Sequence, residues 1–113
     1  MKIAVTSTGP DLESELDPRF GRARYFIIID TETNEFTAID NLEGLNAYGG
    51  AGVRSAGIVA DHGVSWVITG NVGPKAAEGL KTAGIKVALS EPIKVSEVVE
   101  KFKKGELKEA QGI

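Results

Sequence analysis

Two glycine-rich turns are the parts of this sequence whose residue types and spacing could do chemistry. One is NAYGGAGVRSAG, residues 46–57, and the other is TGNVGPKAAEGL, residues 69–80; each leads into a stretch that is predicted to be helical. Glycines at such a position let backbone N–H groups approach a ligand, and the unpaired donors of a helix N-terminus favour an anion. The turns therefore predict anion binding, with an ordinary tight turn as the alternative.

The arginines are segregated toward the same parts of the chain. Three of the four arginines lie in the segment 7–24 (STGPDLESELDPRFGRAR) and the fourth is Arg54, whereas eight of the nine lysines lie from Lys75 onward. The planar guanidinium group binds anions through several donors in a fixed geometry. The same segment carries acidic residues, so the alternative is a solvated loop whose charges pair with one another. We predict that the arginines contribute to an anion site.

The hydrophobic pattern predicts the elements that position these turns. The first three are strands at 2–6, 25–30 and 35–40, the last of them at a sheet edge, and the later elements alternate between helix and strand. These later elements are predicted at 51–62 (helix), 65–69 (strand), 74–83 (helix), 85–89 (strand) and 95–103 (helix). A three-strand meander followed by two strand–helix units predicts an α/β fold with a mixed five-stranded sheet flanked by helices. If the first, fourth and fifth strands are parallel, both glycine-rich turns meet at one edge of the sheet.

Composition limits the class of protein. The 113 residues are enough for one domain, and we expect 1–113 to form a single domain whose tail, about 104–113, frays or lies on the surface. A net charge of −3 gives no global attraction to nucleic acid or to an anionic membrane, and the absence of cysteine removes disulfides and thiolate ligands. No stretch has the pattern of a signal peptide or a membrane span, so we expect a cytoplasmic protein.

A family resemblance is carried by the blocks DPRFGRARYFIIID and YGGAGVRSAGIVADHGVSWVITGNVGPKAAEGLKTAGIKV. The chain resembles the dinitrogenase iron–molybdenum cofactor biosynthesis family, which includes NifX, NafY and the C-terminal domain of NifB, and the resemblance covers nearly the whole chain in order. It implies a ribonuclease-H-like fold with a mixed five-stranded sheet. It also implies a non-enzymatic role in binding, holding or passing on an anionic iron–sulfur or iron–molybdenum cofactor or its precursor, with a cofactor-assembly protein as partner.

The predicted cofactor-binding residues come from the end of the first strand, the loop before the second strand and the two glycine-rich turns. They are Ser7, Arg19, Phe20, Gly21, Arg22, Gly49, Gly50, Gly52, Arg54, Gly70, Asn71 and Gly73. We expect Gly50 and Gly52 to serve ligand access, so that Gly52→Ala does not destabilise the empty protein. Arg22→Ala and Arg54→Ala are expected to weaken anion binding and to leave folding intact.

Direct ligation of iron is the difficulty for this interpretation. Iron in such clusters takes Cys thiolate or sometimes His, and the chain has no Cys and a single His. His62 is predicted at the C-terminal end of its helix, where an imidazole interacts with the helix terminus rather than with a metal. We therefore assign no metal ligand, and cluster binding would rest on outer-sphere contacts, on carboxylates or on a second protein.

No catalytic residue is assigned, and the expected protein is not an enzyme. The first strand lacks the carboxylate that a ribonuclease-H-like nuclease uses at its metal ions, and no G-x-G-x-x-G motif follows that strand directly. The alternative function is a binding or sensor module for a small phosphate-bearing metabolite at the same two helix starts. Visible absorption separates the two functions, because a bound metal cluster colours the protein and a phosphate ligand does not.

Overall fold

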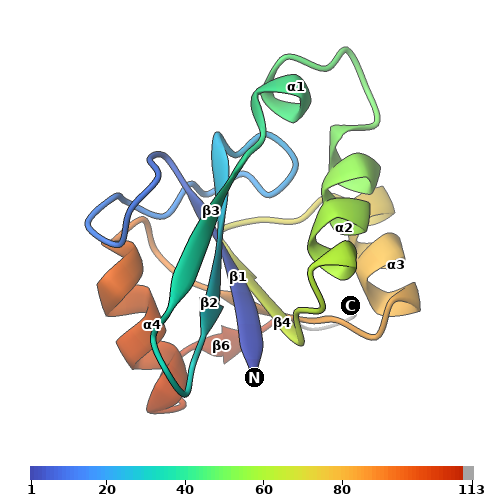
Figure 1. The fold of residues 1–113 in the computed structure, drawn as a ribbon. Helices are drawn as coiled ribbons and strands as arrows, with labels where there is room; N and C mark the ends of the chain where they lie inside the picture. Colours follow the sequence, from blue (N-terminus) through green and yellow to red (C-terminus); the bar gives the residue numbers. More distant parts are fainter. Residues whose placement is uncertain (111–113) are drawn as a thin grey trace.

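The strands of the chain form one mixed sheet in a computed structural model that describes residues 1–110 (Figure 1). The strand order is β3-β2-β1-β4-β5-β6. The strands are β1 (Lys2–Ser7), β2 (Tyr25–Asp30), β3 (Phe36–Asp40), β4 (Trp66–Thr69), β5 (Lys86–Leu89) and β6 (Lys108–Glu109). The helices are α1 (Leu42–Leu45), α2 (Ala51–Asp61), α3 (Pro74–Thr82) and α4 (Val95–Lys103).

β1 lies inside the sheet and fixes the direction of its neighbours. Its register joins Ala4 to Ile28 in the antiparallel neighbour β2 and to Val67 in the parallel neighbour β4. β4 in turn pairs in parallel with β5, whereas β3 and β6 are antiparallel to the strands beside them. The first, fourth and fifth strands are therefore parallel, as the predicted site required, and their carboxyl ends lie at one edge of the sheet.

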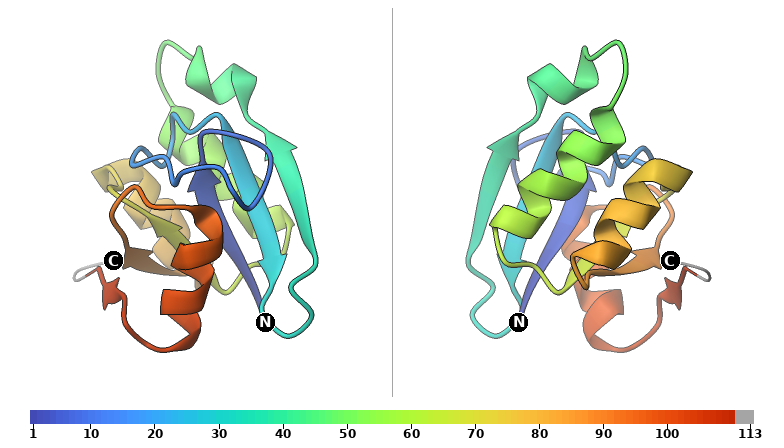
Figure 2. Two further views of the ribbon diagram at one scale, coloured as in Figure 1. Left: turned by 90° about the vertical axis from the view of Figure 1, so that its left-hand side faces the viewer. Right: turned by 90° about the vertical axis from the view of Figure 1, so that its right-hand side faces the viewer.

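Helices cover both faces of this sheet (Figure 2). On one face α2 and α3 pack side by side, and their buried Val59 and Leu80 join a core cluster that includes Val67 of β4. On the other face, Val98 of α4 packs in a second cluster that includes Ile27 of β2. The continuous apolar run FIII within β2 follows from this layering, because a strand that is covered on both faces buries the side chains on both of its sides.

Two short elements were not predicted, and the predicted five-stranded sheet is wrong. β6 falls in the tail that was expected to fray or to lie on the surface. Its two residues are exposed, but the strand is ordered by pairing with β5, and the N–H of Ala110 donates to the carbonyl of Val87 at 2.9 Å. The four-residue helix α1 lies between β3 and the first glycine-rich turn, ahead of α2. The last three residues of the predicted tail, 111–113, lie outside the described residues. The ribonuclease-H-like fold and the single-domain assignment stay predictions.

The long connection between β1 and β2 has a structural role at α4. The backbone N–H of Val95 donates to the carbonyl of Ser14 at 2.8 Å, and that of Ser96 donates to the carbonyl of Leu12 at 2.9 Å. These groups belong to the first turn of α4 and have no acceptor within the helix. The connection therefore satisfies the N-terminus of α4.

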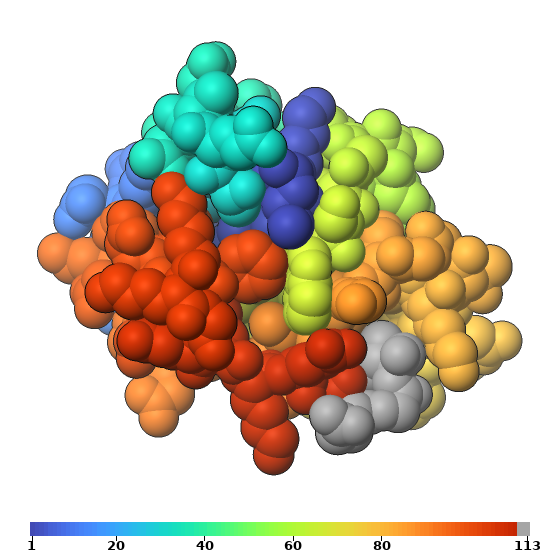
Figure 3. Space-filling model, turned by 90° about the horizontal axis from the view of Figure 1, so that it is seen from below, coloured from blue at the N-terminus to red at the C-terminus, as the bar shows by residue number. Residues whose placement is uncertain are grey.

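The end of the sheet where β1 begins carries the chain's amino terminus beside α4 and β6 (Figure 3). A hollow of about 480 Å³ at this end is lined mainly by apolar groups, among them Trp66, Phe102 and Leu107. Among residues 1–110, no helix is both long enough and apolar enough to span a membrane.

Candidate functional site

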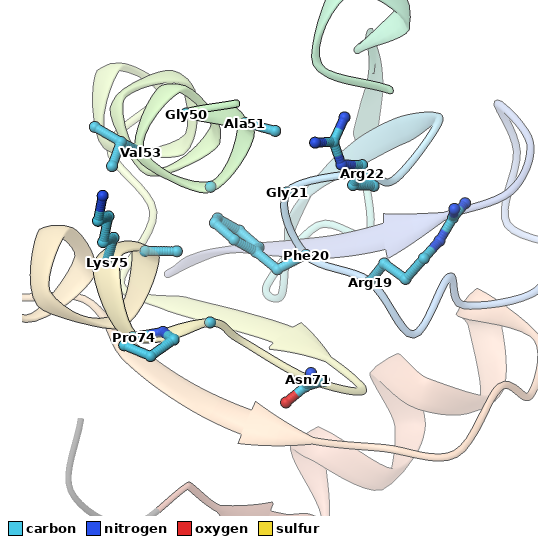
Figure 4. A pocket seen from close by; sticks show the side chains of 13 residues that line it. Arg19, Phe20, Gly21, Arg22, Gly50, Ala51, Val53, Asn71, Pro74 and Lys75 are labelled. Carbon is cyan, nitrogen blue, oxygen red and sulfur yellow. The ribbon is translucent and has the colours of Figure 1, made fainter. Parts of the chain in front are cut away.

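A pocket of about 530 Å³ lies at the edge of the sheet where β1 and β4 end (Figure 4). Three segments line it: 19–22 from the long connection, 50–53 at the start of α2, and residues at 71 and 73–76 that lead into α3. Phe20 lies between the two helices in Figure 4 and is only 2% exposed, so an aromatic ring forms the pocket's apolar inner wall. The pocket thus joins the two glycine-rich turns and the arginine-bearing loop, as predicted.

The N-termini of α2 and α3 both open toward this pocket. The first helical hydrogen bonds run from Arg54 N–H to the Gly50 carbonyl and from Ala77 N–H to the Gly73 carbonyl, so the earlier N–H groups have no intrahelical acceptor. No side chain caps either helix, and the capping residues are Gly50 and Gly73. This distinguishes both helices from α4, whose first N–H groups are satisfied by carbonyls. The pocket is therefore bordered by two sets of free backbone donors with the positive ends of two helix dipoles.

The charged side chains of the pocket wall are all cationic. Arg19, Arg22 and Lys75 line it, and within the part of the chain that the structure describes no acidic residue does. Lys75 is exposed and stands in the first turn of α3, next to the free N–H groups. Its charge adds to the helix dipole rather than opposing it, so the wall favours an anion.

Arg19 forms an ion pair with a buried carboxylate, that of Asp17. Its Nε and Nη2 donate to the two oxygens of Asp17 at 3.2 and 3.1 Å, and its backbone N–H donates to the same carboxylate at 2.9 Å. Asp17 is 3% exposed, and its hydrogen bonds and charge raise the pKa of the Arg19 guanidinium above its ordinary value. Part of the charge of Arg19 is thereby compensated at the pocket wall.

Arg22 and Arg54 also have partners within the fold, so the alternative of charges that pair applies in part to the arginines predicted at the anion site. Arg22 turns toward α1 and donates through Nη1 to the carbonyls of Gly44, Leu45 and Ala47. Arg54 forms an exposed ion pair with Glu43 and does not line the pocket. The expectation that Arg22→Ala leaves folding intact stays a prediction, and these bonds argue against it.

Gly52 is required by packing, which contradicts its expected role in ligand access alone. A Cβ atom at this position would lie 2.8 Å from the Cβ of Ala76, in the facing turn of α3. A Cβ at Gly21 would lie 2.8 Å from the backbone nitrogen of Gly52. The first turn of α2 is therefore packed tightly between the loop and α3. Gly50 has a φ of 73°, so it also meets a conformational requirement as the residue that caps α2.

The structure brings together eight of the twelve predicted site residues. Those that line the pocket are Arg19, Phe20, Gly21, Arg22, Gly50, Gly52, Asn71 and Gly73. Of the others, Ser7 is buried and donates to the Gly9 carbonyl at 2.7 Å, and Gly70 allows close approach of Pro18. Gly49 is exposed ahead of α2 and does not line the pocket, nor does Arg54.

The lining residues that sequence reasoning missed are Ala51, Val53, Pro74, Lys75 and Ala76. All five stand in the first turns of α2 and α3. Lys75 could have been found, because it directly follows the Gly-Pro pair that marks the start of a helix.

Metal-ligating side chains do not gather at the pocket. Among residues 1–110 there is no group of three or more His, Asp or Glu side chains that could hold a metal ion. His62 lies at the C-terminal end of α2, where its Nδ1 is 2.9 Å from the carbonyl oxygen of Ile58. It shares a separate hollow with Lys2 and Asp30. The imidazole thus interacts with the end of its helix, as predicted, at the far end from the pocket.

The fold and the pocket define a small mixed α/β protein with a cationic pocket at the carboxyl edge of its sheet. The family model described as dinitrogenase iron–molybdenum cofactor matches residues 1–105, and the chain belongs to this family. The family is associated with the biosynthesis and binding of the iron–molybdenum cofactor. The resemblance that the sequence blocks carried is therefore confirmed.

Three relatives show how widely the fold and sequence are shared. The orange protein of Desulfovibrio gigas, solved in its apo form, is 39% identical with a TM-score of 0.94, covering 98% of this chain and 93% of that one. A Thermotoga protein solved as a NifB candidate is 38% identical with a TM-score of 0.86, covering 99% and 95%. An uncharacterized protein of Methanocaldococcus jannaschii is 34% identical over 109 residues, which cover 95% of this chain and 89% of the relative.

Proposed function

We propose that this protein binds an anionic iron–sulfur or iron–molybdenum type cofactor, or its precursor, in the pocket between α2 and α3 and passes it to an assembly partner without catalysing a reaction. The observation that carries the proposal is the convergence of two uncapped helix N-termini on a pocket whose charged side chains are all cationic. Family membership supports the same ligand class. The cytoplasm is the location that we expect for this role.

The pocket suits a bulky anion better than a small one. A volume of about 530 Å³ exceeds what a single phosphate group fills, and the wall includes the apolar surfaces of Phe20, Val53 and Ala76. Backbone N–H groups and lysine bind an anion's surface atoms without replacing its own metal ligands. This matches a cargo that arrives as a finished cluster and leaves again, since outer-sphere contacts are easier to exchange than bonds to iron.

The absence of cysteine in the sequence sets a condition on this proposal. Iron must keep its sulfide and other ligands throughout binding, because the chain offers no thiolate and, among residues 1–110, no carboxylate or imidazole lines the pocket. The cargo is therefore a complete anionic cluster, or its remaining ligands come from a second protein. The orange protein is similar to this chain, and the description of its structure as the apo form implies that it also has a ligand-bound form.

An anaerobic titration tests the proposal. Purified protein is mixed with a synthetic iron–sulfur cluster that carries its own thiolate ligands, and visible absorption that co-elutes with the protein measures binding. We expect Lys75→Gln to weaken binding by about ten-fold or more, since a charge-assisted contact is worth roughly 1.5 to 3 kcal/mol. Lys81→Gln is the matched control, because it makes the same charge change in the last turn of α3, outside the pocket.

Two outcomes would contradict the proposal. If the protein remains colourless after gel filtration while it binds a sugar phosphate or nucleotide at Lys75, the phosphate-bearing metabolite is the ligand instead. If Lys75→Gln and Lys81→Gln bind the cluster equally, the pocket is not where the cluster lies.

A further inference from the structure

The segment 41–50 joins β3 to α2 and reaches the pocket at its last residue. It contains α1 and ends at Gly50, the residue that caps α2 and lines the pocket. Tyr48 in this segment is fully exposed, so its side chain makes no packing contribution that would hold the backbone in place. Other residues of the segment must therefore hold it in place.

Asn41 fastens the beginning of the segment to the loop that lines the pocket. Its backbone N–H donates to the carbonyl of Arg24 at 2.9 Å, and its Nδ2 donates to the carbonyl of Ala23 at 2.8 Å. Asn41 is 1% exposed, so these bonds are shielded from water. This end of the segment is anchored by buried contacts.

Arg22 fastens the other end. Its Nη1 lies 3.4 Å from each of the carbonyl oxygens of Gly44 and Leu45 and also donates to the carbonyl of Ala47. These oxygens are at and just beyond the C-terminal end of α1, where the carbonyls favour a cation, and that of Gly44 also accepts from the Ala47 N–H at 3.3 Å. Arg22 is half-buried, and its one side chain binds both the end of α1 and Ala47, the residue before Tyr48.

Arg22 differs from the other three arginines in the nature of its partners. Arg19, Arg24 and Arg54 each form an ion pair with a carboxylate. All the acceptors of Arg22 among residues 1–110 are backbone carbonyls, so its charge is not neutralised by an acidic side chain. Arg22 can therefore hold a backbone segment and at the same time contribute positive charge to the pocket wall.

We infer that Arg22 is a positioning residue: it holds the segment 41–50, whose last residue Gly50 caps α2 and lines the pocket, and anion binding and closure of this segment support each other. The inference rests on the proposed function for the ligand class, and it assigns Arg22 a role other than the direct contact expected from the sequence. Because coupling between a ligand and a conformation is reciprocal, an anion that needs the closed segment must also stabilise it.

Limited proteolysis with chymotrypsin tests the first half of this inference on the empty protein. Since Tyr48 is already fully exposed, the rate of cleavage after it reports how often the backbone of the segment opens rather than how well the side chain is covered. We expect Arg22→Gln to speed this cleavage by about ten-fold or more, because it removes the charge-assisted bonds to the α1 carbonyls. Lys75→Gln is the control, since it removes the same charge from the pocket wall without touching the segment, and its cleavage rate should equal that of the parent.

The second half is tested with a polyoxotungstate anion as probe, at a temperature where circular dichroism shows every variant to be folded. A saturating probe should slow cleavage after Tyr48 in the parent and in Lys75→Gln, and should give little protection in Arg22→Gln. Arg22→Lys keeps the charge but offers one ammonium group in place of the guanidinium fork, so it should recover at most part of the parent's affinity and protection.

Three results would overturn the inference: unchanged cleavage of empty Arg22→Gln, no protection of the parent by a bound probe, or full recovery of affinity in Arg22→Lys, which would show that only charge is needed. If the parent itself binds neither probe nor cluster, the proposed function fails and the coupling fails with it. The cleavage rates of the empty proteins still decide, in that case, whether Arg22 holds the segment.

Discussion

Gly52→Ala is the substitution for which the structure and the sequence predict opposite effects. From the sequence, a methyl group in the first turn of a helix should be neutral or favourable by up to about 1 kcal/mol. In the structure, the added Cβ would lie 2.8 Å from the Cβ of Ala76, whereas carbon atoms in contact are normally about 3.5 to 4.0 Å apart. The helices α2 and α3 would have to separate by about 1 Å at this point.

The first turn of α2 has little room for that movement. On its other side the loop approaches so closely that a Cβ at Gly21 would lie 2.8 Å from the nitrogen of Gly52. Overpacking of this kind costs about 1 to 3 kcal/mol. After subtraction of a helix-propensity gain of about 1 kcal/mol, we expect Gly52→Ala to lower the free energy of unfolding by up to about 2 kcal/mol.

Urea unfolding of a double-mutant cycle with Ala76→Gly measures this cost. The glycine at 76 removes the methyl group that the new one would meet, so the double variant should be more stable than the sum of the single changes predicts, by about 1 kcal/mol or more. Gly57→Ala is the matched control in the same helix, because a Cβ there would have no atom within 4 Å, and it should stabilise the protein by about 0.5 to 1 kcal/mol. Equal stability of Gly52→Ala and Gly57→Ala would refute the packing argument.

Two further predictions concern charged residues outside the pocket border. The Leu42 N–H and then the Arg24 guanidinium lower the pKa of the Asp40 carboxyl below its usual value near 4, so its contribution to stability is present above about pH 4 and is lost as the pH falls through the lowered pKa. Urea midpoints measured from pH 5 downward should therefore show a weaker loss of stability in Asp40→Asn than in the parent, and parallel curves would contradict this. Asp17→Ala should lower the free energy of unfolding by about 2 to 3 kcal/mol, because it removes a buried carboxylate that accepts three hydrogen bonds from Arg19. A loss below about 0.5 kcal/mol, the range of an ordinary surface change, would show that these bonds contribute little.

Periodicity predicted most of the fold because most elements are long enough to show it. The strand at Tyr25–Asp30 and the helix at Val95–Lys103 have the predicted bounds, and each of the other predicted elements differs by one residue at one end. β6 has two residues and α1 has four, so neither is long enough to show a repeat. Both form through contacts with distant parts of the chain, which a local pattern does not contain.

The pocket was predictable in outline, whereas the partners of its arginines were not. Gly-Pro and Gly-rich turns after strands mark helix starts locally, and parallel strands bring such turns to one edge. The partner of Arg54 is Glu43, and Arg22 reaches carbonyls more than twenty residues away. Such choices depend on tertiary positions that the spacing of charges does not specify. The segregation of the arginines pointed to two of the segments that line the pocket, but it did not indicate which arginines form ion pairs or bind carbonyls.

The loop that carries Asp-Pro-Arg-Phe-Gly-Arg connects the sheet to the pocket and to the segment 41–50. The hydroxyls of Thr6 and Thr69 lie 2.8 Å apart at the ends of the parallel strands β1 and β4, and Thr6 donates to the backbone carbonyl of Asp17. From this anchor the loop places Phe20 between α2 and α3 and sends Arg22 to the segment 41–50. A shift of the loop would therefore move the aromatic wall and the α2 border together. This explains physically why so much chain lies between β1 and β2: the connection builds the pocket as well as satisfying the N-terminus of α4.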